Sequence, residues 1–265
     1  HAEYRGVKQN TMSLNYKVSG TGPPLIILHG FLGSLDNWQT HARSLSDMAT
    51  VYIVDARNHG RSPHYPEHSY ALMAEDLKGF MDEQGLEKAS LLGHSMGGKA
   101  VMEFANRYPD MIEKLIIADI SPREYTWNYD TIFSALHNVK LDKVTNRSDA
   151  EEMLREVIKE DGMVQFLLKS LDRNPDGSYE WKMNLDVLYD GFEEVIKGIE
   201  LKGTHSFPTL VIRGANSKYV EDKDLEQFKA HFTNLQIVTL ENAGHWLHAE
   251  APKAFLEALV KFLGK

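Results

Sequence analysis

Cysteine is absent from the 265 residues of the sequence. Its absence excludes a disulfide framework, a thiol nucleophile and a zinc site built on cysteine. A chain without cysteine is compatible with the reducing cytoplasm, and we expect the protein to be cytoplasmic.

Long apolar segments are also missing. No run approaches the roughly 20 residues that a membrane-spanning helix needs, so we expect no integral membrane association. No signal peptide is recognisable in the sequence. The chain begins at His1 rather than Met, which we interpret as a tag remnant or an absent true start.

Positive charge is scarce relative to negative charge. The 29 Lys and Arg residues face 38 Asp and Glu residues, which gives a formal net charge of −9. Nucleic-acid surfaces need clustered Lys and Arg, so we expect no nucleic-acid partner. The remaining composition, 42% hydrophobic and 25% charged, is that of an ordinary globular protein.

Short apolar runs alternate with helical patterns along most of the chain. This alternation predicts an α/β fold with a mostly parallel central sheet flanked by helices. The predicted strands lie at 12–18, 25–28, 51–54, 89–92, 115–120, 208–213 and 236–240.

The segment 123–204 lacks buried-strand runs and is rich in charged and helix-forming residues. We therefore predict a core formed by 1–122 and 205–265, with an inserted helical cap, or lid, over 123–204. An ordinary helical subdomain that covers the core fits the same pattern. The aromatic residues of this segment receive no individual roles; they include Tyr125, Trp127, Tyr129 and Trp181.

One stretch, Gly93-His94-Ser95-Met96-Gly97-Gly98, joins a predicted strand to a predicted helix. Its G-x-S-x-G pattern in this context is typical of a nucleophile elbow, which exposes the serine hydroxyl in a tight turn. The glycines leave room for that turn. The start of the following helix favours a developing oxyanion.

The same stretch approaches the pattern of a phosphate-binding P-loop over Gly93–Lys99. It is one residue short, and Ala100 stands where Ser or Thr should bind magnesium. These two departures disfavour nucleotide binding, and we expect no cofactor.

A serine hydroxyl needs an adjacent base before it becomes a good nucleophile. His245 follows the last predicted strand, and the carboxyl ends of parallel strands meet at one edge of a sheet, so His245 is the predicted base. His94 is expected to point elsewhere, and His248 to face the lid or solvent. The His245-x-x-His248 pair has no third ligand in view, so we predict no metal site.

The base needs a carboxylate partner. No carboxylate follows the strand at 208–213 until Glu221, and Asn216 cannot carry the charge. Asp119 ends the strand after the elbow helix, where a buried charge needs a partner. We predict that Asp119 is the triad acid, with a cap or turn role before Ser121-Pro122 as the alternative.

Two backbone amides are the predicted oxyanion donors. One belongs to Met96, directly after the nucleophile, and the other to Phe31, in the loop after the strand at 25–28. Asp55, Arg57 and His59 are expected to stabilise a turn rather than to form a second site.

Taken together, these motifs resemble the α/β-hydrolase superfamily over nearly the whole chain. The motifs are His29-Gly30-Phe31, Asp55-x-Arg57-x-x-Gly60-x-Ser62, Gly93-His94-Ser95-Met96-Gly97-Gly98 and Gly244-His245. A narrower resemblance is to YbfF-type esterases. It rests on Phe31-Leu32-Gly33-Ser34-Leu35-Asp36-Asn37-Trp38, Asp55-Ala56-Arg57-Asn58-His59-Gly60, Ala118-Asp119-Ile120-Ser121-Pro122 and Arg213-Gly214-Ala215-Asn216-Ser217-Lys218-Tyr219-Val220.

This resemblance implies a triad acid after the strand that follows the nucleophile helix, which agrees with Asp119. It also implies hydrolysis of short acyl esters and, in some members, of acyl-CoA thioesters. Members of the superfamily with an aspartate nucleophile are excluded by Ser95.

We therefore expect a serine esterase whose partner is a small-molecule acyl ester or thioester. The rival hypotheses are a carbon–carbon bond hydrolase or perhydrolase on the same triad, a non-catalytic ligand receptor on this fold, and a nucleotide-binding protein. The sequence leaves the acyl chain length, the leaving group and the oligomeric state open.

Overall fold

A seven-stranded sheet forms the centre of the computed structural model, which describes residues 13–264. The strand order is β1-β3-β2-β4-β5-β8-β9; β1 pairs antiparallel with β3, and the other neighbours pair in parallel. The predicted mostly parallel sheet is thus confirmed. The strands are β1 (Tyr16–Ser19), β2 (Pro24–Leu28), β3 (Thr50–Val54), β4 (Ala89–His94), β5 (Ile112–Ala118), β8 (Thr209–Gly214) and β9 (Leu235–Leu240). Met12, the first residue of a predicted strand, and the chain start at His1 lie outside the described residues.

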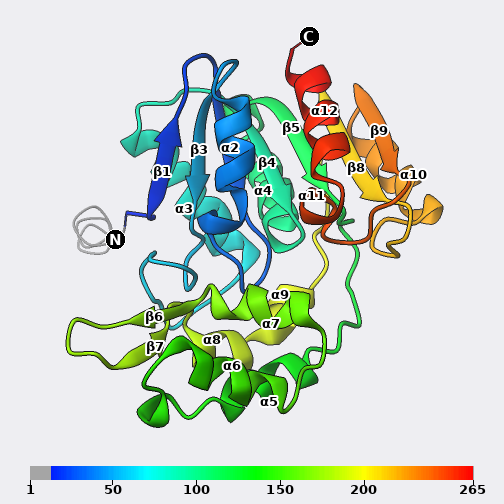
Figure 1. The fold of residues 1–265 in the computed structure, drawn as a ribbon. Coiled ribbons are helices and arrows are strands. Elements are labelled where there is room, and N and C mark those ends of the chain that lie inside the picture. Colours follow the sequence, from blue (N-terminus) through cyan, green and yellow to red (C-terminus); the bar gives the residue numbers. More distant parts are fainter. Residues whose placement is uncertain (1–12, 265) are drawn as a thin grey trace.

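Helices cover both faces of this sheet (Figure 1). Successive side chains of a strand point to opposite faces, so along β4 Leu91 joins one apolar cluster and Leu92 the other. The first cluster includes α3 (Tyr70–Glu83), α4 (Met96–Arg107) and α10 (Asp222–His231). The second includes η1 (Leu35–Trp38), α2 (Gln39–Leu45), α11 (Leu247–Glu250) and α12 (Pro252–Leu263). A short turn of helix, η2 (Pro109–Met111), precedes β5.

The segment between β5 and β8 lies below the sheet in Figure 1. It is mostly helical: α5 (Asp130–Asn138), η3 (Leu141–Lys143), α6 (Arg147–Arg155), α7 (Asp161–Leu168), α8 (Leu185–Asp190) and α9 (Phe192–Ile196). It also contains a hairpin of β6 (Leu171–Arg173) and β7 (Tyr179–Trp181), which the sequence analysis did not predict. Each hairpin strand has only three residues, too few for an alternating pattern to show.

Side-chain caps start several helices. Ser69 accepts a hydrogen bond from the Leu72 amide at the start of α3, and Ser34 accepts one from Asp36 at the start of η1. Residues 39–45 form the helix that follows η1. Within the described part of the chain, no helix has the length and apolar character needed to cross a bilayer.

Candidate active site

The site begins at the junction of β4 and α4, where Ser95 adopts φ 56° and ψ −116°. A Cβ on Gly93 would lie 2.1 Å from the Gly97 carbonyl oxygen, and one on Gly97 would lie 2.2 Å from the Leu28 carbonyl oxygen. Only glycine fits at these two positions, so the chain can make the tight turn. Ser95 is thereby held in a positive-φ conformation at the carboxyl edge of the sheet.

Three predicted side chains come together at this edge. The Ser95 Oγ lies 2.8 Å from His245 Nε2, and His245 Nδ1 lies 2.8 Å from Asp119 Oδ2. A carboxylate only accepts hydrogen bonds, so Nδ1 carries the proton and Nε2 is free to accept the Ser95 hydroxyl proton. The Tyr219 ring stacks on the His245 ring with centroids 3.7 Å apart, which fixes the plane of the imidazole.

Asp119 is fully buried, directly after β5, with φ 51°. The Gly214 amide donates to its Oδ1 at 3.0 Å, and the Ser217 hydroxyl donates to its Oδ2 at 2.5 Å. These donors compensate the cost of burying the charge. No sequence pattern identifies Gly214, Ser217 or Tyr219 as supports of the site. Their stretch carried part of the family resemblance, and that was the one available indication.

The predicted oxyanion donors lie beside the serine. A Cβ on Gly30 would be 3.4 Å from the Ser95 Cβ, so the loop that carries Phe31 runs next to the nucleophile. Met96 is the first residue of α4. Among residues 13–264, no acceptor takes the amide hydrogen of Phe31 or Met96. Both amides are therefore without an acceptor in the loops next to Ser95, so the oxyanion role stays a prediction.

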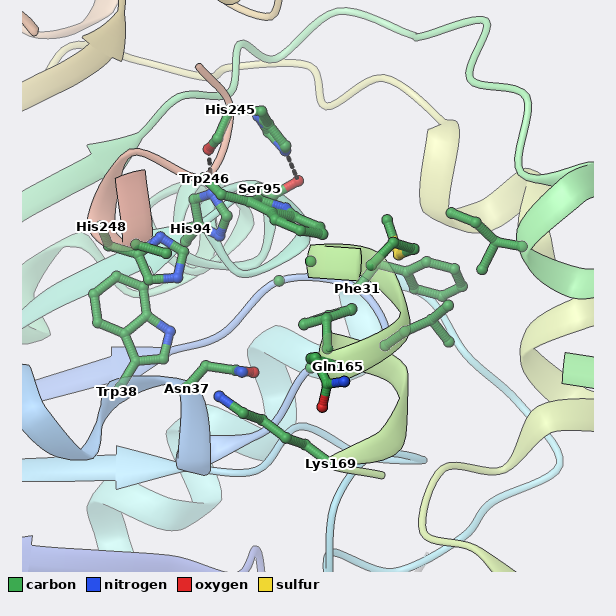
Figure 2. A pocket seen from close by; sticks show the side chains of 18 of the residues that line it. Phe31, Asn37, Trp38, His94, Ser95, Gln165, Lys169, His245, Trp246 and His248 are labelled. Atoms are coloured by element: carbon green, nitrogen blue, oxygen red, sulfur yellow. Dashed lines mark hydrogen bonds between the residues drawn. The ribbon is translucent and has the colours of Figure 1, made fainter. Parts of the chain in front are cut away.

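A cavity of about 280 Å³ opens at the serine (Figure 2). The core of the protein and the 123–204 segment both contribute to its wall. Tyr129 is the one aromatic residue among Tyr125, Trp127, Tyr129 and Trp181 that lines it. The lining residues are Gly30, Phe31, Leu32, Gly33, Asn37, Trp38, His94, Ser95, Tyr129, Ile132, Gly162, Met163, Gln165, Phe166, Lys169, His245, Trp246, His248 and Ala249.

Two further histidines border the base. His94 points away from Ser95, as expected, and its Nε2 donates to the His245 carbonyl oxygen at 2.8 Å. The ring of His248 is buried and stacks on Trp38 at 4.3 Å, so it does not face solvent. It lines the cavity with Phe166 and Lys169 of 123–204, which is the lid-facing one of the two expected positions. Burial is the main cause that lowers the pKa of both rings, and it lowers that of His248 to about 3. Both rings are therefore neutral near pH 7.

The expected turn network orders the loop before η1. The Asp55 carboxylate accepts hydrogen bonds from the Leu35 and Arg61 amides, and His59 Nε2 accepts one from the Leu32 amide. These bonds hold the Phe31 loop in place next to the serine. The network therefore supports the site rather than forming a second one.

The lysine of the P-loop-like stretch is unavailable to a phosphate. Lys99 is fully buried, and its ammonium donates to the carbonyl oxygens of Arg123 at 2.8 Å and Lys197 at 2.5 Å. A P-loop lysine must instead reach a bound phosphate. This geometry argues against nucleotide binding at Gly93–Lys99.

Comparison with known proteins agrees with this geometry. The alpha/beta hydrolase fold family matches residues 23–252. The chain is 39% identical to the esterase YbfF of Escherichia coli K12, over 91% of this chain and 92% of that protein. It is 38% identical to the sn-1-specific diacylglycerol lipase ABHD11 of Mus musculus, over 92% of this chain and 81% of that protein. A solved marine microorganism esterase superposes with a TM-score of 0.92 at 40% identity, covering 95% of this chain and 100% of the other.

Proposed function

Because the chain belongs to the α/β-hydrolase family, we propose that it is a serine esterase that hydrolyses short-chain acyl esters. The observation that carries the proposal is the continuous contact from Ser95 Oγ through His245 to Asp119. The names of the relatives, an esterase and a diacylglycerol lipase, support carboxylic-ester hydrolysis as the reaction class. Thioesters are a further substrate class for the same chemistry.

In the proposed mechanism, Ser95 Oγ attacks the carbonyl carbon of the ester while His245 Nε2 takes the hydroxyl proton. The amides of Phe31 and Met96 stabilise the oxyanion that forms. His245 then gives its proton to the departing alkoxide oxygen, which leaves an acyl ester on Ser95. Water attacks that ester, its proton passes through His245 back to Ser95 Oγ, and the carboxylic acid is released. Asp119 orients His245 and stabilises the imidazolium in each half-reaction.

The proposal includes a cap role for 123–204 over a core of 1–122 and 205–265. Tyr129, Ile132, Met163 and Phe166 of this segment line the cavity above Ser95. Ligand pockets range from roughly 300 to 1,000 Å³, and the cavity of about 280 Å³ lies just below that range. Its size supports a preference for small acyl groups.

Hydrolysis of p-nitrophenyl esters from acetyl to palmitoyl tests the proposal, with Ser95→Ala as the blank. We expect turnover that falls steeply beyond short chains and disappears in the variant. Acyl-CoA thioesters are the second substrate series. No Ser95-dependent turnover on either series would overturn the proposal and favour a specialised hydrolase or a ligand receptor.

A further inference from the structure

The cavity at Ser95 has two chemically different walls. One wall is apolar and is formed by Phe31, Tyr129, Ile132, Met163 and Phe166. The other carries nitrogen donors from the core and from the C-terminal end of α7. Figure 2 shows these side chains, Asn37, Trp38 and Lys169, with the Lys169 ammonium extended toward the Asn37 carboxamide. The proposed hydrolysis of a simple acyl ester does not need this second wall.

Trp38 is the most informative member of the donor wall. Its side chain is 1% exposed, and its Nε1–H has no hydrogen-bond partner among the described residues. A buried donor without an acceptor costs stability and is rare in native proteins. The Nδ1 of His248, whose ring stacks on Trp38, also lacks a partner in the described part of the chain. Trp38 and His248 both line the cavity, so a polar ligand there would supply the missing partners.

The carboxamide oxygen of Asn37 already takes part in a hydrogen bond within the protein. Its Oδ1 accepts a hydrogen bond from the Ser34 amide at 2.9 Å, as part of the cap of η1. That bond fixes which end of the amide is the acceptor, so the Nδ2 hydrogens remain as donors. The amide therefore adds a second fixed donor to the wall that contains Trp38.

Lys169 brings a positive charge to the same wall. Within 13–264, its Nζ has neither a hydrogen-bond acceptor nor a carboxylate partner. The nearby Asp36 carboxylate lies 3.8 Å from the ammonium of Lys182, which also donates to the Lys169 carbonyl oxygen. The charge of Lys169 contributes, after burial and two neighbouring histidines, to the lowered pKa of His248. The donor wall is thus positively charged.

We propose that this donor wall, formed by Trp38, Asn37 and Lys169, binds a carboxylate of the substrate. The inference rests on the proposed esterase function and adds a substrate class to it, esters that carry a free carboxylate. An indole N–H, an amide NH₂ and an ammonium offer only donors, which match the acceptor-only oxygens of a carboxylate. The small cavity favours a carboxylate over a larger polyphosphate.

Two matched pairs of esters test the proposal and locate the carboxylate. The first pair, p-nitrophenyl hydrogen adipate and p-nitrophenyl hexanoate, differs by a carboxylate on the acyl half. The second, 4-(butanoyloxy)benzoate and phenyl butanoate, differs by one on the leaving group. We expect the wild type to have the higher kcat/KM for the charged member of one pair.

The variants Lys169→Met and Asn37→Asp should lower that preference at least about tenfold, the size expected for one hydrogen bond to a charged group. Asn37→Asp keeps the oxygen that caps η1 and replaces the donor with a negative charge, so it tests the site without removing the cap. Lys159→Met, at an exposed lysine of the same segment outside the cavity, is the matched control. Equal preference in all four proteins would overturn the proposal.

A binding measurement separates this proposal from the esterase proposal. Calorimetry with monomethyl adipate and with 4-(butanoyloxy)benzoate on Ser95→Ala, and on the same variant with Lys169→Met added, needs no turnover. For the ester whose charged half is preferred, we expect binding at least about tenfold weaker in the double variant. Absence of binding of both esters, or equal affinities in both proteins, would contradict the carboxylate site. Loss of all Ser95-dependent hydrolysis would contradict only the esterase function.

Discussion

At the scale of single residues, the environment of Asp119 separates it from Glu221 and Asp222, the carboxylates that follow β8. Asp119 contacts His245 directly. The Glu221 side chain caps α10, and Asp222 pairs with Arg213 at 2.8 Å with its own side chain 88% exposed. These two carboxylates have structural partners, and Asp119 is the one that faces the proposed base.

Asp119→Asn should keep the size of the side chain and remove its charge. The variant favours the wrong tautomer of His245, so we expect kcat to fall by about 10⁴-fold, as in the worked serine-protease triad. Steady-state hydrolysis of a short p-nitrophenyl ester measures the effect. Asp222→Asn is the control and should remain near wild type. The acid assignment is wrong if Asp119→Asn stays active while a change at Glu221 or Asp222 abolishes turnover.

The residue types and spacing of the sequence were enough to predict the three side chains that meet at the edge of the sheet. The elbow pattern identified Ser95, and the ends of two parallel strands identified Asp119 and His245. The burial of His248 was not predictable in this way. Its ring stacks on Trp38, which is distant in the sequence, so its burial depends on tertiary packing and not on any local pattern.

At the scale of elements, Lys99 of α4 contacts both ends of the segment 123–204. Its ammonium donates to the carbonyl oxygen of Arg123, where the chain enters this segment, and to that of Lys197, where the chain leaves it. The Ile199 amide also donates to the Pro122 carbonyl oxygen at 2.6 Å. Burial, followed by the charge of Arg123, lowers the pKa of Lys99 to about 7. One side chain of α4 thus contacts both ends of the segment 123–204.

Lys99→Met should destabilise the protein, because it removes the donor from carbonyl oxygens that remain buried. We expect the free energy of unfolding to fall by about 1–3 kcal/mol, the usual cost of leaving a buried polar group unsatisfied. Urea denaturation measures this change, and amide exchange should rise around Arg123 and Lys197. Lys78→Met removes a solvent-exposed pair with Asp82 and should change stability little. Equal stability of the two variants would contradict the role of Lys99.

Most elements were predictable because their apolar spacing is long and regular. The three-residue strands β6 and β7 were not predictable, and neither were the exact ends of some longer elements. The capping-box pattern at Ser148 and Glu151 predicts a helix start near Ser148, but α6 begins at Arg147, with Asn146 accepting the bond from the Asp149 amide. Ser and Asn are about equally good N-cap residues. Which of two neighbouring residues caps the helix therefore depends on the course of the preceding loop, and the sequence pattern does not decide it. The predicted strand at 115–120 ends at Ala118 instead, because Asp119 turns out of it with positive φ.

At the scale of the whole molecule, buried neutral histidines distinguish this protein. Burial lowers the pKa of six rings, and that of His68 and His248 to about 3. The six are His29, His41, His59, His68, His94 and His248. Their unfolded value is about 6.5, so between roughly pH 6.5 and 3 the unfolded chain binds more protons than the folded one. Stability should therefore fall as the pH falls through this window.

His68→Asn should flatten this dependence. Each histidine that is neutral when folded and charged when unfolded adds about 1.4 kcal/mol per pH unit to the slope. Between pH 6 and 4, the slope of the variant should therefore be smaller than that of the wild type by about this amount. The free energy of unfolding in urea at several pH values gives the slope. His137→Asn, at an exposed histidine, should leave it unchanged. An identical slope in wild type and His68→Asn would show that this ring is not buried in its neutral form.

The central claim is that Ser95 is a nucleophile activated by His245 and Asp119, and covalent labelling with a fluorophosphonate tests it most directly. Peptide mass spectrometry after brief exposure should find one phosphonyl adduct, on Ser95. The adduct should be absent in Ser95→Ala and form much more slowly in Asp119→Asn, because the hydroxyl then lacks an oriented base. Labelling at another residue, or equal labelling rates in wild type and Asp119→Asn, would contradict the account.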